Sequence, residues 1–380
     1  MPEAVYLHIP FCVNICHYCD FNKVFLQGQP VARYLEIMEM EMKNTVKKYP
    51  YDFIETIFVG GGTPTALDEK QLEYFLQSVK NHFITSKLAE FTVEANPEQT
   101  TKKKLEIMKK YGVNRLSIGV QAFQTSLLKE LGRTHRQEDV FATIKNAKET
   151  GIENISLDIM FGLPNQTVDM LNETLDIAFS LQIPHFSAYS LQIEKKTVFY
   201  NRFRNGNLPL PTEEQEAEMY KLLIHKMQQN GYHQYEISNF ARPGYESKHN
   251  LQYWNNNEYY GIGAGAHSYV EGERKVNAGP LKKYMALIEE TGFPYIESHK
   301  VSFQEKMEEE LFMGLRKIAG VSDSTFKRRY GKSMFEIFKQ PIHSLMQRGL
   351  LKKEGDTIAL TKKGVFLGNE VFQEFITLES

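Results

Sequence analysis

The pattern of apolar and polar positions predicts that the first half of the chain alternates between strands and helices. Short apolar runs, each separated from the next by a helical stretch, are typical of strands buried in a parallel sheet. Repeated strand–helix units place their strands side by side, so these runs predict an α/β fold with six β/α units that form a partial barrel. The predicted strands are residues 5–9, 56–60, 91–95, 115–120, 155–160 and 185–190.

Residues 31–49 predict a long helix between the first two strands. Leu35, Met38, Met42 and Val46 recur at helical spacing and form one apolar stripe. Methionine fills irregular gaps in cores, so we interpret this stripe as packing and not as a cofactor site.

The pattern changes after Pro209. Residues 212–230 predict an amphipathic helix that Thr212 opens in a capping arrangement. Residues 232–240 predict a strand that leads into an aromatic region punctuated by glycine. Gly-x-Gly-x-Gly at 261–265 lacks the strand–turn–helix context of a dinucleotide-binding fingerprint, and we do not interpret it as one.

The last eighty or so residues predict a separate small domain. Helical runs at 305–317, 323–330 and 342–349 precede a hairpin-like segment at 350–364. Helices followed by a hairpin are typical of a winged-helix-like α+β domain. The predicted organisation is a TIM-type partial (β/α)6 barrel over 1–210, a barrel extension over 211–300 and the winged-helix-like domain over 301–380.

Composition narrows the class of protein. The 380 residues are 42% hydrophobic and 24% charged, as in ordinary globular proteins, and the net charge of −2 gives no reason to expect nucleic acid. No apolar run approaches the roughly 20 residues of a membrane span. The Met-Pro-Glu start enters a predicted strand at once, so we expect no signal peptide.

All three cysteines stand within eight positions, at the spacing C-x3-C-x2-C. Cys12, Cys16 and Cys19 are too close for all of them to pair as disulfides, and three thiolates suit an iron–sulfur cluster better than zinc. A four-iron cluster would keep one iron open to a small chelating molecule. The alternatives are three cysteines in a core, or a structural zinc that borrows His8 or His17.

Polar residues and glycines follow several predicted strands. Gly61, Gly62 and Thr63 follow the second strand, where glycine lets the backbone approach a ligand closely. Glu94, Gln121 and Asp158 stand toward the carboxyl ends of later strands, where a barrel places its ligand-binding face. The sequence therefore predicts a polar ligand site at that end of the barrel.

These motifs resemble the radical S-adenosylmethionine (SAM) family. The resemblance includes Tyr18 just before Cys19 and the words Gly-Gly-Gly-Thr-Pro-Thr, Val-Glu-Ala-Asn-Pro, Gly-Val-Gln-Ala-Phe and Asp-Ile-Met-Phe-Gly-Leu-Pro. It implies a [4Fe-4S] cluster on the three cysteines, whose open iron binds the amino and carboxylate groups of SAM. The SAM-binding residues that it implies are Tyr6, Tyr18, Gly61, Gly62, Thr63, Glu94, Gln121, Arg133 and Asp158.

Two functions are found in the branch of the family that the chain resembles. One is oxidative decarboxylation by oxygen-independent coproporphyrinogen III dehydrogenases, and the other is heme delivery by heme chaperones. The dehydrogenases resemble C-x3-C-x2-C-x-C, but Phe21 stands here in place of the fourth cysteine. The chaperones share Cys19-x-Phe21 and the word His-Asn-x-x-Tyr-Trp at His249 to Trp254. The resemblance therefore favours a heme chaperone over the dehydrogenase.

The segment from His249 to Trp254 is the candidate heme site. Imidazole and tyrosinate are both known heme ligands, so His249 and Tyr253 are the candidates, with Asn250 beside them and Trp254 offering a flat apolar surface. The alternative for His249 is a hydrogen-bonded structural histidine in an aromatic core. Because this segment lies far along the chain from the cysteines, we expect heme binding not to require the cluster.

The resemblance also implies partners and a compartment. We expect heme and unidentified heme-acceptor proteins as partners, no nucleic acid, at most peripheral membrane contact, and a monomer or dimer. Cysteines that must remain thiolates indicate a reducing compartment, and we expect the cytoplasm. The family uses a domain like the one predicted at the end of the chain as a lid beside the barrel mouth.

Overall fold

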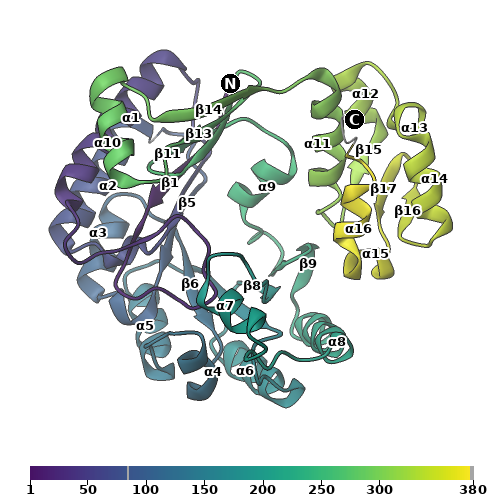
Figure 1. Cartoon of the computed structure of the whole chain (residues 1–380), viewed down its shortest axis with the longest axis horizontal. Coiled ribbons are helices and arrows are strands. Elements are labelled where there is room, and N and C mark those ends of the chain that lie inside the picture. Colours follow the sequence, from purple (N-terminus) through teal and green to yellow (C-terminus); the bar gives the residue numbers. More distant parts are fainter. Residues whose placement is uncertain (84, 377–380) are drawn as a thin grey trace.

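Six parallel strands in sequence order form the centre of the fold in a computed structural model, which describes residues 1–83 and 85–376. Each strand pairs with the next in parallel register, as expected when a helix returns the chain to the same edge. The predicted partial (β/α)6 barrel is therefore confirmed (Figure 1). The strands are β1 (Ala4–Ile9), β4 (Thr56–Gly61), β5 (Glu90–Ala95), β6 (Arg115–Gln121), β7 (Asn154–Phe161) and β8 (His185–Ser190).

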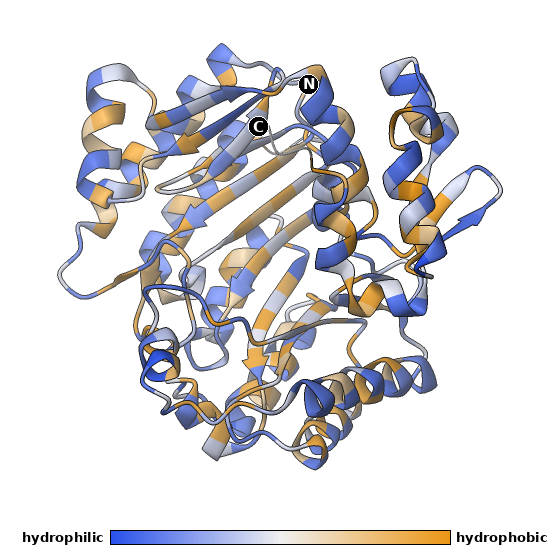
Figure 2. Cartoon of the chain, turned by 45° about the vertical axis from the view of Figure 1, so that its right-hand side comes forward, coloured by the Kyte–Doolittle hydropathy of each residue, from blue (hydrophilic) through white to orange (hydrophobic). Residues whose placement is uncertain are grey.

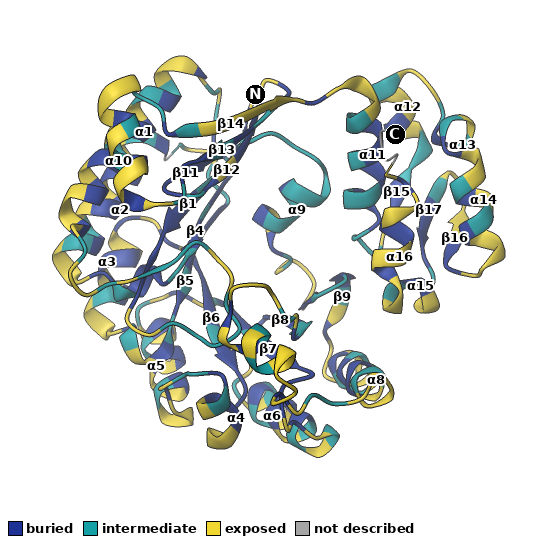
Figure 3. Ribbon diagram, viewed as in Figure 1, coloured by how far each residue is buried: buried dark blue, intermediate teal, exposed yellow. Residues whose placement is uncertain are grey.

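Helices cover the outer face of this sheet. In Figure 3 the strands are buried, while the helices expose their outward sides. The stripe predicted in α1 is packed as expected, because Leu35, Met38 and Met42 are buried. The main elements of this layer are α1 (Val31–Lys48), α2 (Glu69–Phe83), α3 (Lys102–Lys110), α5 (Gln137–Glu149), α6 (Val168–Ser180) and α8 (Glu213–Gln229), and α4 (Thr125–Glu130) follows β6. Helix α7 (Val198–Arg204) instead packs against the cysteine loop, where the Phe199 nitrogen donates to the His17 carbonyl.

The cysteine loop lies between β1 and α1. Two short strands, β2 (Phe11–Cys12) and β3 (Val24–Phe25), pair in parallel and close the two ends of this loop upon one another. Two 3-10 turns, η1 (Pro64–Ala66) and η2 (Pro97–Gln99), follow β4 and β5.

The sheet continues past both edges of the barrel to twelve strands. On the β1 side β11 (Tyr259–Ile262) adds in parallel, and β12 (His267–Val270), β13 (Glu273–Asn277) and β14 (Tyr295–Lys300) follow antiparallel. Helix α10 (Leu281–Thr291) joins the last two strands. The Gly-x-Gly-x-Gly segment thus joins two strands and opens no helix, which confirms that it is not a dinucleotide fingerprint.

The single strand predicted for residues 232–240 is wrong. The chain instead forms β9 (His233–Glu236) and β10 (Asn239–Ala241), which pair antiparallel around a two-residue turn, and β10 pairs with β8. Ser238 and Asn239 are residue types common in turns, but the prediction of a single strand did not weigh them against the apolar run. The Glu236 carboxylate supports the turn by accepting hydrogen bonds from the Ser238 and Asn239 nitrogens.

The last part of the chain forms an α+β domain beside the open side of the barrel (Figure 1, yellow-green). A three-stranded antiparallel sheet in the order β15–β17–β16 packs with helices, and this confirms the predicted helices and hairpin. The elements are α11 (Phe303–Gly314), β15 (Val321–Ser322), α12 (Asp323–Tyr330), α13 (Met334–Ile337), α14 (Lys339–Gln347), β16 (Leu351–Glu354), β17 (Thr357–Leu360), α15 (Lys362–Phe366) and α16 (Gly368–Gln373).

A short helix, α9 (Lys248–Trp254), lies between the barrel and the last domain (Figure 1). Buried Glu90 at the start of β5 accepts hydrogen bonds from the backbone nitrogens of Lys248 and His249, and so holds the first turn of this helix. A carboxylate there also suits the positive end of the helix dipole.

Apolar residues concentrate in the strands (Figure 2). The buried apolar residues form separate clusters in the barrel and in the last domain. One large buried cluster lies between the barrel strands and their helices, and a second fills the last domain. No helix among residues 1–83 and 85–376 combines the length and the apolar character that crossing a membrane requires.

A buried carboxylate ties α1 to the extension of the sheet. Glu41 is 1% exposed and accepts hydrogen bonds from the Tyr284 hydroxyl, the Asn277 side chain and the Gly263 backbone nitrogen. Burial raises the pKa of Glu41 to about 7. The three donors come from β13, α10 and the loop after β11, so one side chain fixes the extension against the barrel.

We therefore expect Glu41→Ala to destabilise the fold. Buried donors left without an acceptor cost about 1–3 kcal/mol each in the free energy of unfolding, so the total loss should exceed about 2 kcal/mol. Denaturation by urea measures it, with Glu36→Ala on the exposed side of the same helix as the control. Equal midpoints for the two variants would contradict this assignment.

Candidate functional site

A cavity of about 370 Å³ opens beside the cysteine loop, at the carboxyl ends of the barrel strands. Side chains from the cysteine loop, from β4 to β8 and from α9 meet in it, although they are spread over more than two hundred positions. The sequence-predicted residues that line it are Cys12, Cys16, Tyr18, Cys19, Gly61, Gly62, Thr63, Glu94, Gln121, Arg133, Asp158 and Asn250. The predicted residues that lie outside its lining are Tyr6, His249, Tyr253 and Trp254.

The three cysteines are free thiols at the edge of this cavity. The Thr63 hydroxyl lies 3.7 Å from Cys12 Sγ, and Arg133 Nη1 lies 3.4 Å from Cys16 Sγ, so these two thiols each have a donor directed at them. Burial raises the pKa of Cys12 to about 11, which keeps the thiol protonated at neutral pH until a metal displaces the proton.

The two histidines that could complete a zinc site are held elsewhere. His8 Nε2 lies 2.7 Å from the Asn22 carbonyl and its Nδ1 lies 2.9 Å from the Tyr6 hydroxyl. His17 Nδ1 lies 2.8 Å from the Glu130 carbonyl. Within the described residues, no three His, Cys, Asp or Glu side chains converge on one point for a single ion. A cubane instead places each thiolate on a different iron, so its ligands stand further apart.

The glycines after β4 are required by the closeness of the cysteine loop. A Cβ on Gly62 would lie 2.9 Å from Cys12 Sγ and 2.7 Å from the Pro10 backbone. Gly61 has a φ of +117°, which a larger residue rarely adopts, and its nitrogen donates to Glu94 at 3.1 Å. This segment therefore brings backbone polar groups, without side chains, to the wall of the cavity.

Two carboxylates lie in the cavity without an ion pair among the described residues. Burial raises the pKa of Glu94 to about 8, and the charge of Asp158 adds to the shift. Burial also raises the pKa of Asp158 to about 6, although the Ser117 hydroxyl donates to it at 3.1 Å. Such acceptors are suited to ligand hydroxyls or to a cation.

Arg133 and Gln121 complete the polar lining of the cavity, and the backbone is distorted at Gln121. Arg133 donates to the Asn96 side chain at 2.9 Å and to the Gly119 carbonyl at 2.6 Å, besides its contact with Cys16. Gln121 has a φ of 67°, and the ladder between β6 and β7 shifts register before it. An irregular residue at a strand end commonly aims a side chain at a ligand.

Sequence reasoning missed several residues of the cavity. Arg115 begins β6 and is 2% exposed, and its Nε has no hydrogen-bond partner among the described residues. Ser117 shares the inward face of this strand, and a period-two count from Gly119 would have found both residues. The other missed lining residues with side-chain polar groups are Asn14, Lys23, Asn96, Ser187, Tyr189, Ser238 and Asn239.

The segment from His249 to Trp254 divides its side chains among different places. His249 is fully buried, with Nδ1 2.9 Å from the Thr56 hydroxyl and Nε2 2.9 Å from the Tyr253 hydroxyl. Both ring nitrogens thus have partners inside the protein, and the structure favours the alternative of a structural histidine. The Trp254 ring packs under the Arg316 guanidinium, 4.7 Å away, and so contacts the last domain.

Tyr253 and Tyr6 line a second cavity of about 430 Å³, which also includes Phe21 and His267. Phe21 follows Cys19 by two positions and lines both cavities. The segment from His249 to Trp254 is therefore close in space to the cysteine loop, although the two are far apart along the chain. Their separation in sequence does not support the prediction that heme binding is independent of the cluster.

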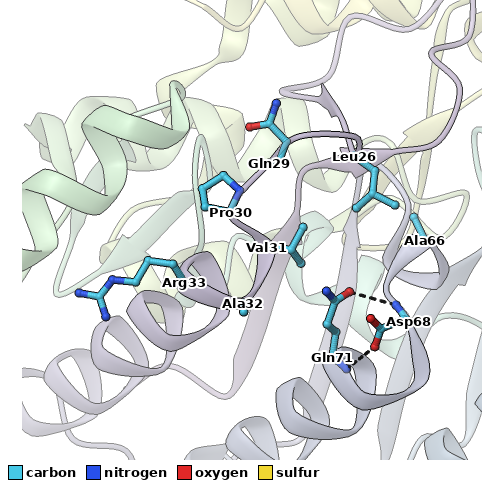
Figure 4. Close-up of a pocket in the computed structure, with 9 residues that line it drawn as sticks. All are labelled: Leu26, Gln29, Pro30, Val31, Ala32, Arg33, Ala66, Asp68 and Gln71. Atoms are coloured by element: carbon cyan, nitrogen blue, oxygen red, sulfur yellow. Dashed lines mark hydrogen bonds between the residues drawn. The ribbon is translucent and has the colours of Figure 1, made fainter.

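A further cavity of about 490 Å³, shown in Figure 4, lies between the start of α1 and the start of α2. Its polar groups bond to one another, because Asp68 and Gln71 exchange hydrogen bonds between side chain and backbone. Arg33 pairs with Glu36 and Glu289 at the surface. No cysteine, histidine or unpaired carboxylate lines this cavity, so we assign it no site.

Comparison with known proteins agrees with this geometry. The family model for the radical SAM superfamily matches residues 6–178, and the model for the HemN C-terminal domain matches residues 301–367. Among solved structures, coproporphyrinogen III oxidase (HemN) from Escherichia coli superposes with a TM-score of 0.88 at 23% identity, over 99% of this chain and 90% of that chain. At that identity the likeness shows the fold alone.

Two relatives of higher sequence identity are named heme chaperone HemW. The chain is 52% identical to the heme chaperone HemW of Bacillus subtilis, over 98% of this chain and 99% of the relative. It is 40% identical to the heme chaperone HemW of Lactococcus lactis, over 99% of this chain and 97% of the relative.

The radical SAM superfamily is the class whose model matches residues 6–178, which include the cysteine loop and most of the partial barrel. Within that class the chain belongs to the HemW family.

The raised pKa of Glu94 predicts a particular pH dependence of stability. The folded chain holds this proton up to about pH 8, whereas the unfolded chain releases it near its ordinary value of about 4.3. The contribution of Glu94 to the free energy of unfolding is therefore full below that value and is lost as the pH rises toward 8. We expect Glu94→Gln to gain stability relative to the wild type between pH 5 and 8.

Urea denaturation of the cluster-free chain at several pH values measures this gain. Glu106→Gln, which alters an exposed carboxylate on α3, is the control. Its free energy of unfolding should change with pH in parallel with that of the wild type. Parallel curves for Glu94→Gln as well would show that Glu94 ionises normally in the folded chain.

Proposed function

We propose that the chain is a heme chaperone that binds a [4Fe-4S] cluster, SAM and heme and passes heme to acceptor proteins. The observation that carries this proposal is the likeness, over nearly the full chain, to relatives named heme chaperone HemW. Phe21 supports it, because a 65% exposed phenyl ring stands where the dehydrogenases have a fourth cysteine.

The donor set beside the first cavity fits a cluster with one open iron. Cys12, Cys16 and Cys19 supply three thiolates, and Lys23 lowers the pKa of Cys19 against the larger effect of burial, which raises it. When bound, the cluster would supply an open iron that chelates the amino and carboxylate groups of SAM. Three thiols that must stay reduced support a reducing compartment, and we propose the cytoplasm.

The polar wall of the same cavity fits SAM. Glu94 and Asp158 have acceptor oxygens for ribose hydroxyls, and the backbone at Gly61 and Gly62 can approach the ligand without hindrance. SAM carries a sulfonium charge, and two half-buried carboxylates would favour it. We keep Tyr18, Thr63, Gln121 and Arg133 in the proposed site because they line the cavity, and Tyr6 as a neighbour beyond it.

Loss of Asp158 should weaken SAM binding. We expect Asp158→Ala to lose roughly 1–3 kcal/mol of binding free energy, the usual cost of an unpaired polar partner, which is about 5- to 150-fold in Kd. Equilibrium binding to the cluster-reconstituted chain measures it, with the exposed Asp52→Ala as the control. SAM affinity equal to that of the wild type would remove Asp158 from the site.

Separate titrations of the cluster-reconstituted chain with heme and with coproporphyrinogen III test the function. A chaperone should bind about one heme per chain with a Soret band and leave the porphyrinogen unchanged under anaerobic, reducing conditions. Decarboxylation of the porphyrinogen without stoichiometric heme binding would restore the dehydrogenase. The proposal also includes unidentified heme-acceptor proteins as partners. It further includes a monomer or dimer, and at most peripheral contact with a membrane.

A further inference from the structure

The second cavity, of about 430 Å³, is lined by the aromatic rings of Tyr6, Phe21, Tyr253 and Tyr259 together with several polar side chains. The Tyr253 and Tyr259 rings meet edge to face at 4.8 Å on one side of it, and Tyr6 lies beside them. Phe21 closes the rim with a ring that is 65% exposed. Aromatic walls of this kind contribute large apolar contact area to a planar macrocycle.

Hydrogen bonds of Asn22 fix the backbone that lines this cavity. Asn22 donates to the carbonyls of Ala264 at 2.8 Å and Gly279 at 3.0 Å, and its own carbonyl lies 2.7 Å from His8 Nε2. Gly265 has a φ of +75°, and a Cβ there would lie 2.7 Å from the Asn22 side chain. The end of the cysteine loop therefore packs directly on the Gly-x-Gly-x-Gly segment.

The Gly-x-Gly-x-Gly segment leads directly to His267, which lines the cavity. His267 begins β12, two residues after Gly265, and its exposed side chain lines the cavity. No side-chain hydrogen bond or ion pair involves it in the part of the chain that the structure describes. His249, in contrast, has both ring nitrogens occupied and is fully buried.

We propose that the second cavity is the heme site and that His267 is the axial ligand of the heme iron. A neutral imidazole with a free nitrogen is the commonest such ligand. His249 then acts as a positioning residue, because its contact with the Tyr253 hydroxyl fixes one wall of the cavity. The inference rests on the proposed heme-binding function and names the residue that holds the iron.

The charges around the cavity set the orientation of heme. Asp20 is the one carboxylate in its lining, and no lysine or arginine lines it. The propionates would therefore turn away from Asp20 into solvent, while the apolar edge enters between Phe21 and the tyrosines. A site with an exposed ligand and an exposed rim leaves heme accessible to an acceptor, which suits delivery more than storage.

Spectroscopic titration of the cluster-reconstituted full chain with ferric heme tests this proposal. In His267→Ala the Soret band and the electron paramagnetic resonance signals should lose their histidine signature. In His267→Met they should change to those of a methionine-ligated heme. His225→Ala, which removes another exposed histidine on α8, is the matched control and should leave the spectra unchanged.

His249→Ala separates the two candidate ligands. We expect this variant to keep the histidine signature, with a lower thermal midpoint because Thr56 and Tyr253 lose their partner. A histidine signature that survives in His267→Ala and vanishes in His249→Ala would overturn the proposal and leave the heme-binding function standing. Absence of heme binding in the wild type would overturn the proposed function itself.

Discussion

The hydrogen bonds of Asn22 to the carbonyls of Ala264 and Gly279 are the constraint on which both cavities depend. They join the end of the cysteine loop to residues more than 240 positions later and so fix the loop over the edge of the sheet. Glycine at 263 and 265 is required because a Cβ at either position would meet His8 or Asn22 at less than 3 Å. This contact positions the cysteine loop, with its three cysteines, relative to His267.

The sequence predicted the barrel well because apolar periodicity and strand-end polar residues are local signals. The six strands were found within a residue or two, and Glu94, Gln121 and Asp158 proved to face one cavity. Contacts between distant segments left no local signal. The antiparallel strands after β11 are stabilised by Glu41 on α1, so they could not be predicted from their own residues. The turn at Ile237 and Ser238 is different, because its supporting contacts with Glu236 are local and the pattern of apolar positions does not reveal them.

The segment from His249 to Trp254 shows why a motif does not assign roles by itself. One short helix places Asn250 in the first cavity, Tyr253 in the second, Trp254 against Arg316 of the last domain and His249 in the core. These positions span nearly two turns, so His249 and Tyr253 share one face of the helix and contact each other. Asn250 and Trp254 share the adjacent face, about 100° away. The segment therefore joins the two cavities and the last domain, and its histidine holds that junction together.

Two carboxylates and an arginine at the first cavity are incompletely satisfied by groups of the protein. Glu94 and Asp158 are half-buried and have no ion pair among the described residues, and Arg115 is buried with an unpartnered Nε. Desolvated groups of this kind destabilise the folded state unless a ligand or water satisfies them. A cationic ligand with hydroxyl groups would satisfy the carboxylates and stabilise the fold in proportion to its binding. Burial raises the pKa values of both carboxyls, so a positively charged ligand beside them would favour their ionised forms.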